Sequence, residues 1–93
     1  MYVVVRKYAN ASALADAMTK REQEVRDLIS NVPGFVAYYA TRDGGNVTSV
    51  TVCESREGTQ ESVRVAREWI QRNLAGSAIP APEVSEGEAF IQF

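Results

Sequence analysis

The stretch FVAYYATRDGGNVTSVTVC, residues 35–53, predicts two β-strands joined by a tight turn. We expect the strands at Phe35–Thr41 and Val47–Cys53, because β-branched and aromatic residues dominate both runs. Between them, Asp43-Gly44-Gly45-Asn46 contains residues that tolerate a positive φ, which is typical of a hairpin. From Phe35 to Ala40 the apolar side chains do not alternate with polar ones, so both faces of this strand should be covered.

A run of the same kind opens the chain. Met1–Tyr8 contains three consecutive valines and predicts another strand that is apolar on both faces. The chain has enough helix to cover only one face of a sheet built from these strands. The simplest cover for the second face is another copy of the same sheet. We therefore expect a homodimer that associates through its sheet faces.

The alternation along the predicted strands assigns side chains to faces. On the middle strand, Phe35, Ala37 and Tyr39 share one face, while Val36, Tyr38 and Ala40 share the other. On the next strand, we expect Val50 and Val52 to face the helices, because they are its larger apolar residues. The smaller and more polar side lines an interface or a cavity, and it consists of Ser49, Thr51 and Cys53.

Two helices are predicted from apolar residues spaced three, four and seven apart. The first runs from about Leu14 to Val32, with Asn10 or Ser12 as its cap and Pro33-Gly34 as its end. The second begins near Ser55 or Thr59 and ends at Gly76. Its apolar stripe is formed by Val63, Ala66, Ile70 and Leu74, with Trp69 beside it. Charged residues form the solvated faces of both helices, namely Lys20, Glu22, Glu24 and Arg26 on the first and Arg64, Glu68 and Arg72 on the second.

An extended connection from Ser77 to Gly87 leads to a final strand at Ala89–Phe93. The order strand, helix, strand, strand, helix, strand predicts a ferredoxin-like βαββαβ fold of the α+β class. It forms a single domain over residues 1–93, with two helices on one face of a four-stranded antiparallel sheet. The other face remains apolar and bare. Whether the final strand is exchanged between subunits is left open by the sequence.

The amino-acid composition limits the kinds of partner and location that we expect for this protein. Ten basic and twelve acidic residues give a net charge of −2, so nothing favours binding to nucleic acid or to an anionic membrane. The chain starts with a strand and contains no apolar run long enough for a signal peptide or a membrane span. The single Cys53 cannot form an internal disulfide. We expect the protein to be cytoplasmic.

Several segments carry a family resemblance: Val32–Phe35, Val52–Ser62, Ala66–Ile70 and Asn73-Leu74. With the element order and the two-sided apolar strands, they resemble the dimeric α+β barrel superfamily, which includes antibiotic-biosynthesis-monooxygenase-like proteins. The matched segments look like a small, uncharacterised bacterial group in that superfamily. The resemblance implies a homodimer whose two sheets close a barrel, and a small pocket between sheet and helices. Activities in the superfamily vary widely, so the fold alone does not assign a function.

The absence of histidine removes several chemistries. Relatives that hold haem iron through histidine, and those that use histidine as an acid or base, are poor guides to this chain. One cysteine and scattered carboxylates predict no metal site. Gly44-Gly45 lies between two strands and is not a phosphate-binding loop. We expect no cofactor.

Five residues are candidates for binding a ligand: Arg6, Tyr38, Tyr39, Trp69 and Asn73. Each also has a structural explanation. Aromatic residues are most often packed in a core, with a hydroxyl group that finds a partner. Arg6 is a charge within an apolar strand. It either pairs with an acid such as Glu54 or Glu88, at a strand end or across the dimer, or binds an anionic group of a ligand. Cys53 is expected to be a small buried hydrophobe.

Three functions remain open, and the sequence does not decide whether the protein is an enzyme. The leading one is a homodimeric domain that binds a small molecule, with a small aromatic ligand as the candidate. The resemblance also implies a cofactor-independent monooxygenase acting on a phenol- or anthrone-type metabolite, which needs an apolar pocket, a hydrogen-bond donor and a base. The third is a structural dimer without a ligand.

Overall fold

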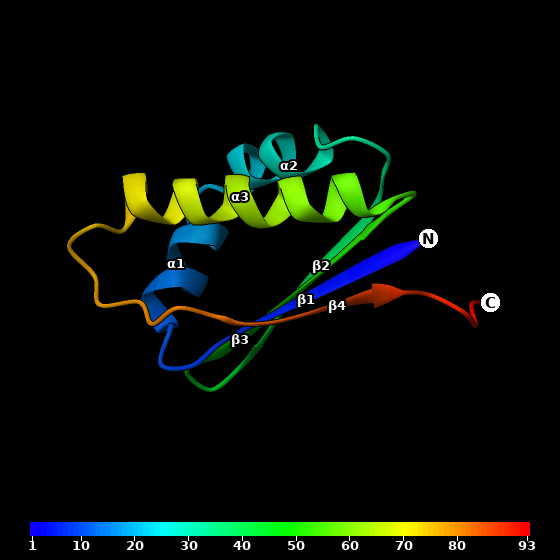
Figure 1. The fold of residues 1–93 in the computed structure, drawn as a ribbon. Helices are drawn as coiled ribbons and strands as arrows, with labels where there is room; N and C mark the ends of the chain where they lie inside the picture. The colour runs from blue at the N-terminus through cyan, green and yellow to red at the C-terminus, as the bar shows by residue number, and fades with distance from the viewer.

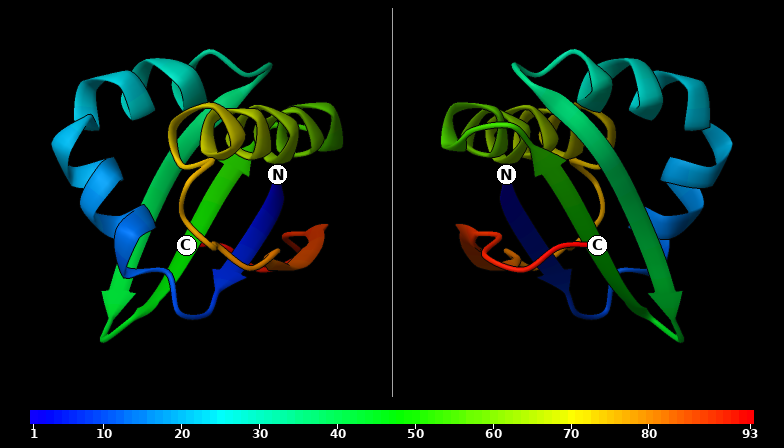
Figure 2. Two further views of the ribbon diagram at one scale, coloured as in Figure 1. Left: turned by 90° about the vertical axis from the view of Figure 1, so that its left-hand side faces the viewer. Right: turned by 90° about the vertical axis from the view of Figure 1, so that its right-hand side faces the viewer.

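Four strands form one antiparallel sheet, and three helices cover one of its faces (Figure 1). In this computed structural model of residues 1–93, the strand order is β2-β3-β1-β4. The elements in chain order are β1 (Tyr2–Tyr8), α1 (Ser12–Lys20), α2 (Glu22–Ser30), β2 (Phe35–Asp43), β3 (Asn46–Cys53), α3 (Arg56–Asn73) and β4 (Glu83–Glu88). The predicted ferredoxin-like α+β fold is confirmed, with three helices in place of two. Figure 2 shows α1, α2 and α3 on the same side of the sheet.

The hairpin between β2 and β3 forms where the glycines predicted it. Asp43 pairs with Asn46 across the turn, which leaves Gly44 and Gly45 as a two-residue loop. Gly44 has a φ of 59°, a conformation that glycine adopts without a steric cost. This connection fixes the register of the two strands.

The first predicted helix is broken in two at Arg21, whose φ and ψ are −118° and 40°. The expectation of one continuous helix is therefore wrong. The break lets α1 pack over β3 while α2 packs over β2, so the pair follows the twist of the sheet. The expected cap is also wrong, because Ala11 occupies the N-cap and neither Asn10 nor Ser12 caps the helix.

The faces of β3 are the reverse of the prediction. Val47, Ser49, Thr51 and Cys53 are buried beneath the helices, whereas Val50 and Val52 lie on the face that no helix covers. The small side chains belong beneath α3 because this helix comes very close to β3. A Cβ atom on Gly58 of α3 would stand 2.8 Å from Sγ of Cys53.

A β-bulge changes the faces of β2. Phe35 pairs with Cys53 and Ala37 pairs with the adjacent residue Val52, so Val36 of β2 has no partner on β3. Phe35 and Tyr38 consequently lie on the helix-facing side, and Ala37 and Tyr39 lie on the open face. Grouping Phe35 with Ala37 and Tyr39 was wrong, since uninterrupted alternation cannot foresee a bulge.

The last strand is β4 at Glu83–Glu88, and the prediction of a strand at Ala89–Phe93 is wrong. β4 is polar, yet six of its residues pair with β1. Glu86 also accepts hydrogen bonds from Arg56 and Thr59 of α3. These tertiary contacts outweigh the strand propensity of the residues that follow, because strand propensity depends strongly on context. The C-terminal residues continue past the end of β4 (Figure 1), and Phe90 is 90% exposed.

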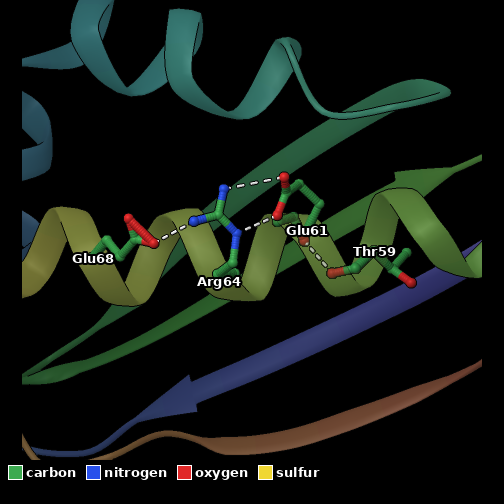
Figure 3. A network of polar contacts seen from close by, with 5 residues as sticks. Thr59, Glu61, Arg64 and Glu68 are labelled. Carbon is green, nitrogen blue, oxygen red and sulfur yellow. Dashed lines mark hydrogen bonds and ion pairs between the residues drawn. The ribbon is translucent and has the colours of Figure 1, made fainter.

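The outer face of α3 has a structural role. Arg64 forms ion pairs with Glu61 and Glu68 on neighbouring turns of the helix (Figure 3). On α2, Arg26 pairs with Glu22 at 2.8 Å. These exposed pairs confirm the predicted solvated faces and stabilise the helices modestly. None of the helices is both long enough and apolar enough to cross a membrane.

The close contact at Gly58 gives a stability prediction. Replacing glycine by alanine within a helix normally stabilises the folded protein by about 0.5–1 kcal/mol. We expect the opposite for Gly58→Ala, because the new Cβ atom would collide with the carbonyl oxygen of Pro33 and with Cys53. The free energy of unfolding in urea should fall by about 1–3 kcal/mol. Gly76→Ala is the control, because no atom lies within 4 Å of its new Cβ atom. Equal stability of the two variants would contradict the close packing.

Candidate functional site

A cavity of about 30 Å³ lies between the helix-facing side of the sheet and the three helices. Its lining is almost entirely apolar, and the side chains come from β1, β2, β3 and all three helices. The lining residues are Arg6, Tyr8, Leu14, Met18, Val25, Leu28, Ile29, Tyr38, Val47, Ser49, Ala66, Trp69 and Ile70. The position agrees with the pocket that the family resemblance implies.

Arg6 supplies the only charge in this lining. It lies on β1 opposite Ser49 of β3, in the middle of the sheet, and its side chain is only 2% exposed. Its Nε and Nη1 atoms are buried without a hydrogen-bond partner, as is Oγ of Ser49. The expected pairing with Glu54 or Glu88 is absent. Glu88 pairs in register with Tyr2, four residues from Arg6 along β1, which is about 13 Å along a strand.

Two tyrosines lie beside this guanidinium group, Tyr8 on β1 and Tyr38 on β2. Burial raises the pKa of both phenols above the ordinary value of 10, and the nearby positive charge of Arg6 offsets part of that effect. Both hydroxyl groups are therefore neutral at pH 7. The cavity thus presents one fixed positive charge and three hydroxyl groups, with no carboxylate or imidazole in its lining.

Trp69 forms part of the wall and is held by a polar network. It is 3% exposed, and its Nε1 donates a hydrogen bond of 2.8 Å to Glu24 of α2. Asn73, one turn further along α3, donates to the carbonyl oxygen of Trp69 at 2.9 Å and accepts a hydrogen bond from Arg21. The break at Arg21 thus places Glu24 against Trp69, although Glu24 was expected on a solvated face. The network ties α2 to α3 and fixes the indole ring.

The five candidates separate into two groups. Arg6, Tyr38 and Trp69 meet in the cavity. Tyr39 lies on the open face with 63% of its surface exposed. Asn73 does not line the cavity and contacts it only through its hydrogen bond to Trp69. Tyr8 was not among the five candidates, whereas Ser49 was predicted to line an interface or a cavity. Sequence reasoning missed the contact of Glu24 with Trp69, for which the sequence contains no signal.

A larger groove of about 860 Å³ lies between α2 and the edge strand β2. The groove and the cavity share four lining residues, namely Met18, Val25, Ile29 and Tyr38. Further along, the groove is lined by the apolar Phe35 and Ala37 and by polar side chains of α2. The shared residues show that the groove adjoins the cavity. Together the two spaces reach the size that small-molecule sites usually have.

The described residues contain no group of three or more potential metal ligands, counting histidine, cysteine, aspartate and glutamate side chains. Cys53 is fully buried, and burial raises the pKa of its thiol. It therefore packs as the small hydrophobe that the sequence predicts.

The raised pKa values give a pH prediction. A phenol whose pKa is higher in the folded than in the unfolded state stabilises the fold fully below pH 10, and this contribution is lost as the pH rises through the folded pKa. We expect the free energy of unfolding to fall above about pH 10. The fall should be smaller in Tyr8→Phe and Tyr38→Phe. When tyrosinate absorbance is followed as the pH rises, the part of the absorbance change that occurs at the highest pH should be missing from the same variants. The control variant Tyr39→Phe should retain this absorbance change at the highest pH. Its loss in the control would contradict the assignment of the change to Tyr8 and Tyr38.

Comparison with known proteins supports the fold. No protein-family model matches the chain, and no curated protein sequence does. Among solved structures, NE2512 from Nitrosomonas europaea, of unknown function, superposes with a TM-score of 0.73 at 13% identity and covers 99% of this chain and 91% of that one. SnoaB from Streptomyces nogalater, a cofactor-independent oxygenase, superposes with a TM-score of 0.67 at 14% identity. The match covers 98% of this chain and 94% of that one.

A third structure, from Chloroflexus aurantiacus, gives a TM-score of 0.66 at 18% identity, over 99% and 95% of the two chains. Its own assignment as an antibiotic biosynthesis monooxygenase is provisional. Identities this low show a shared fold and do not transfer a reaction. The predicted resemblance is thus confirmed at the level of the fold: this chain has the ferredoxin-like α+β architecture of antibiotic-biosynthesis-monooxygenase-like proteins.

Proposed function

We propose that this protein is a cytoplasmic homodimer that binds a small organic molecule in the cavity between sheet and helices. The observation that carries the proposal is the polar corner of an otherwise apolar cavity, where Nε and Nη1 of Arg6 and Oγ of Ser49 lack hydrogen-bond partners. A few polar groups that converge in an apolar pocket are the usual features of a ligand site. The cytoplasmic location is supported by Cys53, which is a free thiol.

A cofactor-independent monooxygenase acting on a phenol- or anthrone-type metabolite is the second candidate. The likeness to SnoaB favours it. The cavity provides donors that can stabilise an enolate or phenolate oxygen, namely Arg6 and the hydroxyl groups beside it. It provides no base in its lining, because both tyrosines are neutral at pH 7. For this reason we place binding ahead of oxygenation.

The third candidate, a structural dimer without a ligand, is supported by the small size of the inner cavity. About 30 Å³ holds no aromatic ring. The adjoining groove provides the additional space that a ligand needs. A structural dimer also leaves the charge of Arg6 unexplained.

The dimer proposal depends on the open face of the sheet. The register places the apolar residues Val3, Val5, Ala37, Tyr39, Val50 and Val52 on this side. No helix covers them (Figure 2). The C-terminal Phe90, Ile91 and Phe93 are also well exposed. An apolar surface of this kind is typical of an interface, and a second copy of the sheet supplies a matching surface.

Sedimentation equilibrium at micromolar concentration tests the dimer. We expect a dimer for the natural protein and a folded monomer for Val50→Glu, because the carboxylate would be buried in the interface without a partner. The dissociation constant should rise roughly hundredfold or more. Gln71→Glu adds the same charge at an exposed site on α3 and should remain dimeric. A dimeric Val50→Glu protein, or a monomeric natural protein, would refute the interface.

Trp69 is the only tryptophan and lines the cavity, so its fluorescence reports what enters. Titration with a panel of neutral and acidic phenyl and naphthyl compounds should shift its emission without consuming oxygen. Ala66→Leu should fill the cavity and abolish the shift, while Ala75→Leu, at an exposed site, should retain it. Oxygen uptake with an anthrone or quinol would establish the monooxygenase. Failure of the whole panel to shift the emission would leave the structural dimer.

A further inference from the structure

We infer that the ligand is a carboxylic acid in its ionised form, with its carboxylate bound to Arg6 and its apolar or aromatic body in the groove between α2 and β2. The inference rests on the proposed function and specifies the chemical class of the ligand. It depends on the buried charge, on the shape of the cavity and on the position of the groove next to the cavity.

Arg6 is a buried charge without compensation. Its side chain is 2% exposed, and it takes part in none of the six ion pairs of the structure. An isolated buried charge is strongly unfavourable. A lysine could lose its proton to escape this cost, but the arginine side chain remains protonated in proteins. The guanidinium group therefore requires an anion.

The chain itself does not provide that anion. The polar neighbours of Arg6 in the cavity are Tyr8, Tyr38 and Ser49, and all three are neutral at pH 7. Arg6 faces the helices, so a partner subunit on the open face lies on the other side of the sheet. An anion must then enter from solution.

The geometry favours a carboxylate. A guanidinium group presents parallel N–H donors that match the two oxygens of a carboxylate. A cavity needs roughly 10–15 Å³ for one water-sized group, so about 30 Å³ accommodates approximately the two oxygens of a carboxylate head. The unpaired Nε and Nη1 of Arg6 and the unpaired Oγ of Ser49 are the available donors.

The groove accounts for the rest of the ligand. It shares Met18, Val25, Ile29 and Tyr38 with the cavity. A molecule with its carboxylate at Arg6 therefore extends past these side chains toward Phe35. The shared residues other than Tyr38 are aliphatic or thioether side chains, which suit an apolar or aromatic body. A small inorganic anion would fill the inner cavity and leave the groove empty.

Calorimetry and Trp69 fluorescence with three probes test the inference on the natural protein. Phenylpropionate carries both the head and the body, phenylpropionamide is its neutral analogue, and propionate carries the head alone. We expect phenylpropionate to bind roughly tenfold to hundredfold more tightly than the amide, because a hydrogen bond to a charged group is stronger than one between neutral groups. Propionate, chloride and phosphate should bind more weakly than phenylpropionate.

Arg6→Met tests the residue itself, because methionine keeps much of the length and removes the charge. The variant should bind phenylpropionate and its amide equally, and its melting temperature without ligand should not fall. Arg6→Lys should restore part of the preference, since it keeps the charge and loses the parallel donors. Arg67→Met, at an exposed site on α3, is the control and should behave as the natural protein. If Arg6→Met does not fold, the three probes on the natural protein decide alone.

The outcomes separate the inference from the proposed function. Equal affinity for the acid and the amide would refute the carboxylate and leave the binding function in place. Binding of propionate or phosphate as tight as that of phenylpropionate would refute the role of the groove. A preference for the acid that persists in Arg6→Met would refute the role of Arg6. If neither these probes nor the wider aromatic panel binds, the proposed function fails together with the inference.

Discussion

The close approach of α3 to β3 determines which side of the sheet is buried. At Gly58 the helix leaves no space for a Cβ atom against Pro33 and Cys53. Only small side chains fit beneath such a contact, and Ser49, Thr51 and Cys53 are among the smallest on the sheet. The alternate residues of β3, including Val50 and Val52, are therefore turned to the open face. The apolar open face and the small, largely apolar cavity beneath the helices thus lie on opposite sides of the sheet.

The sequence predicted the elements well and their faces less well. Alternation and hairpin chemistry located β1, β2 and β3, because these signals are local. The faces of β3 were inverted because apolar residues were assigned to the core by size, whereas the fit against Gly58 is a tertiary constraint. The bulge in β2 and the polar strand β4 likewise depend on pairing partners distant in sequence.

The candidate site shows the same division. Arg6 could be selected from the sequence because a charge in an apolar strand is conspicuous, and Tyr38 and Trp69 because aromatic residues suit a pocket. Alternation placed Tyr38 and Tyr39 on opposite faces of the strand, and the fold decides which of the two faces the helices. Glu24 is brought to Trp69 only by the break between α1 and α2. Local patterns therefore identify residue types with unusual surroundings, and the fold decides which of them meet.

The two faces of the sheet suit assembly and binding respectively, and the two surfaces meet at the edge strand β2. The apolar open face has the character of an interface, while the groove and the cavity lie on the helix side. A ligand bound beside Arg6 contacts β1 and β3 from one side, and a second subunit would contact the same strands from the other. On β1 and β3, neighbouring residues point to opposite faces. On the edge strand β2, however, Ala37 and Tyr39 belong to the open face and also line the groove. Any coupling between ligand binding and dimerisation would pass through this edge of β2 or through the backbone of β1 and β3. Both are central strands, paired on each edge, and such strands resist displacement. The architecture therefore places the most direct route for such coupling at β2, an edge strand that pairs only with β3.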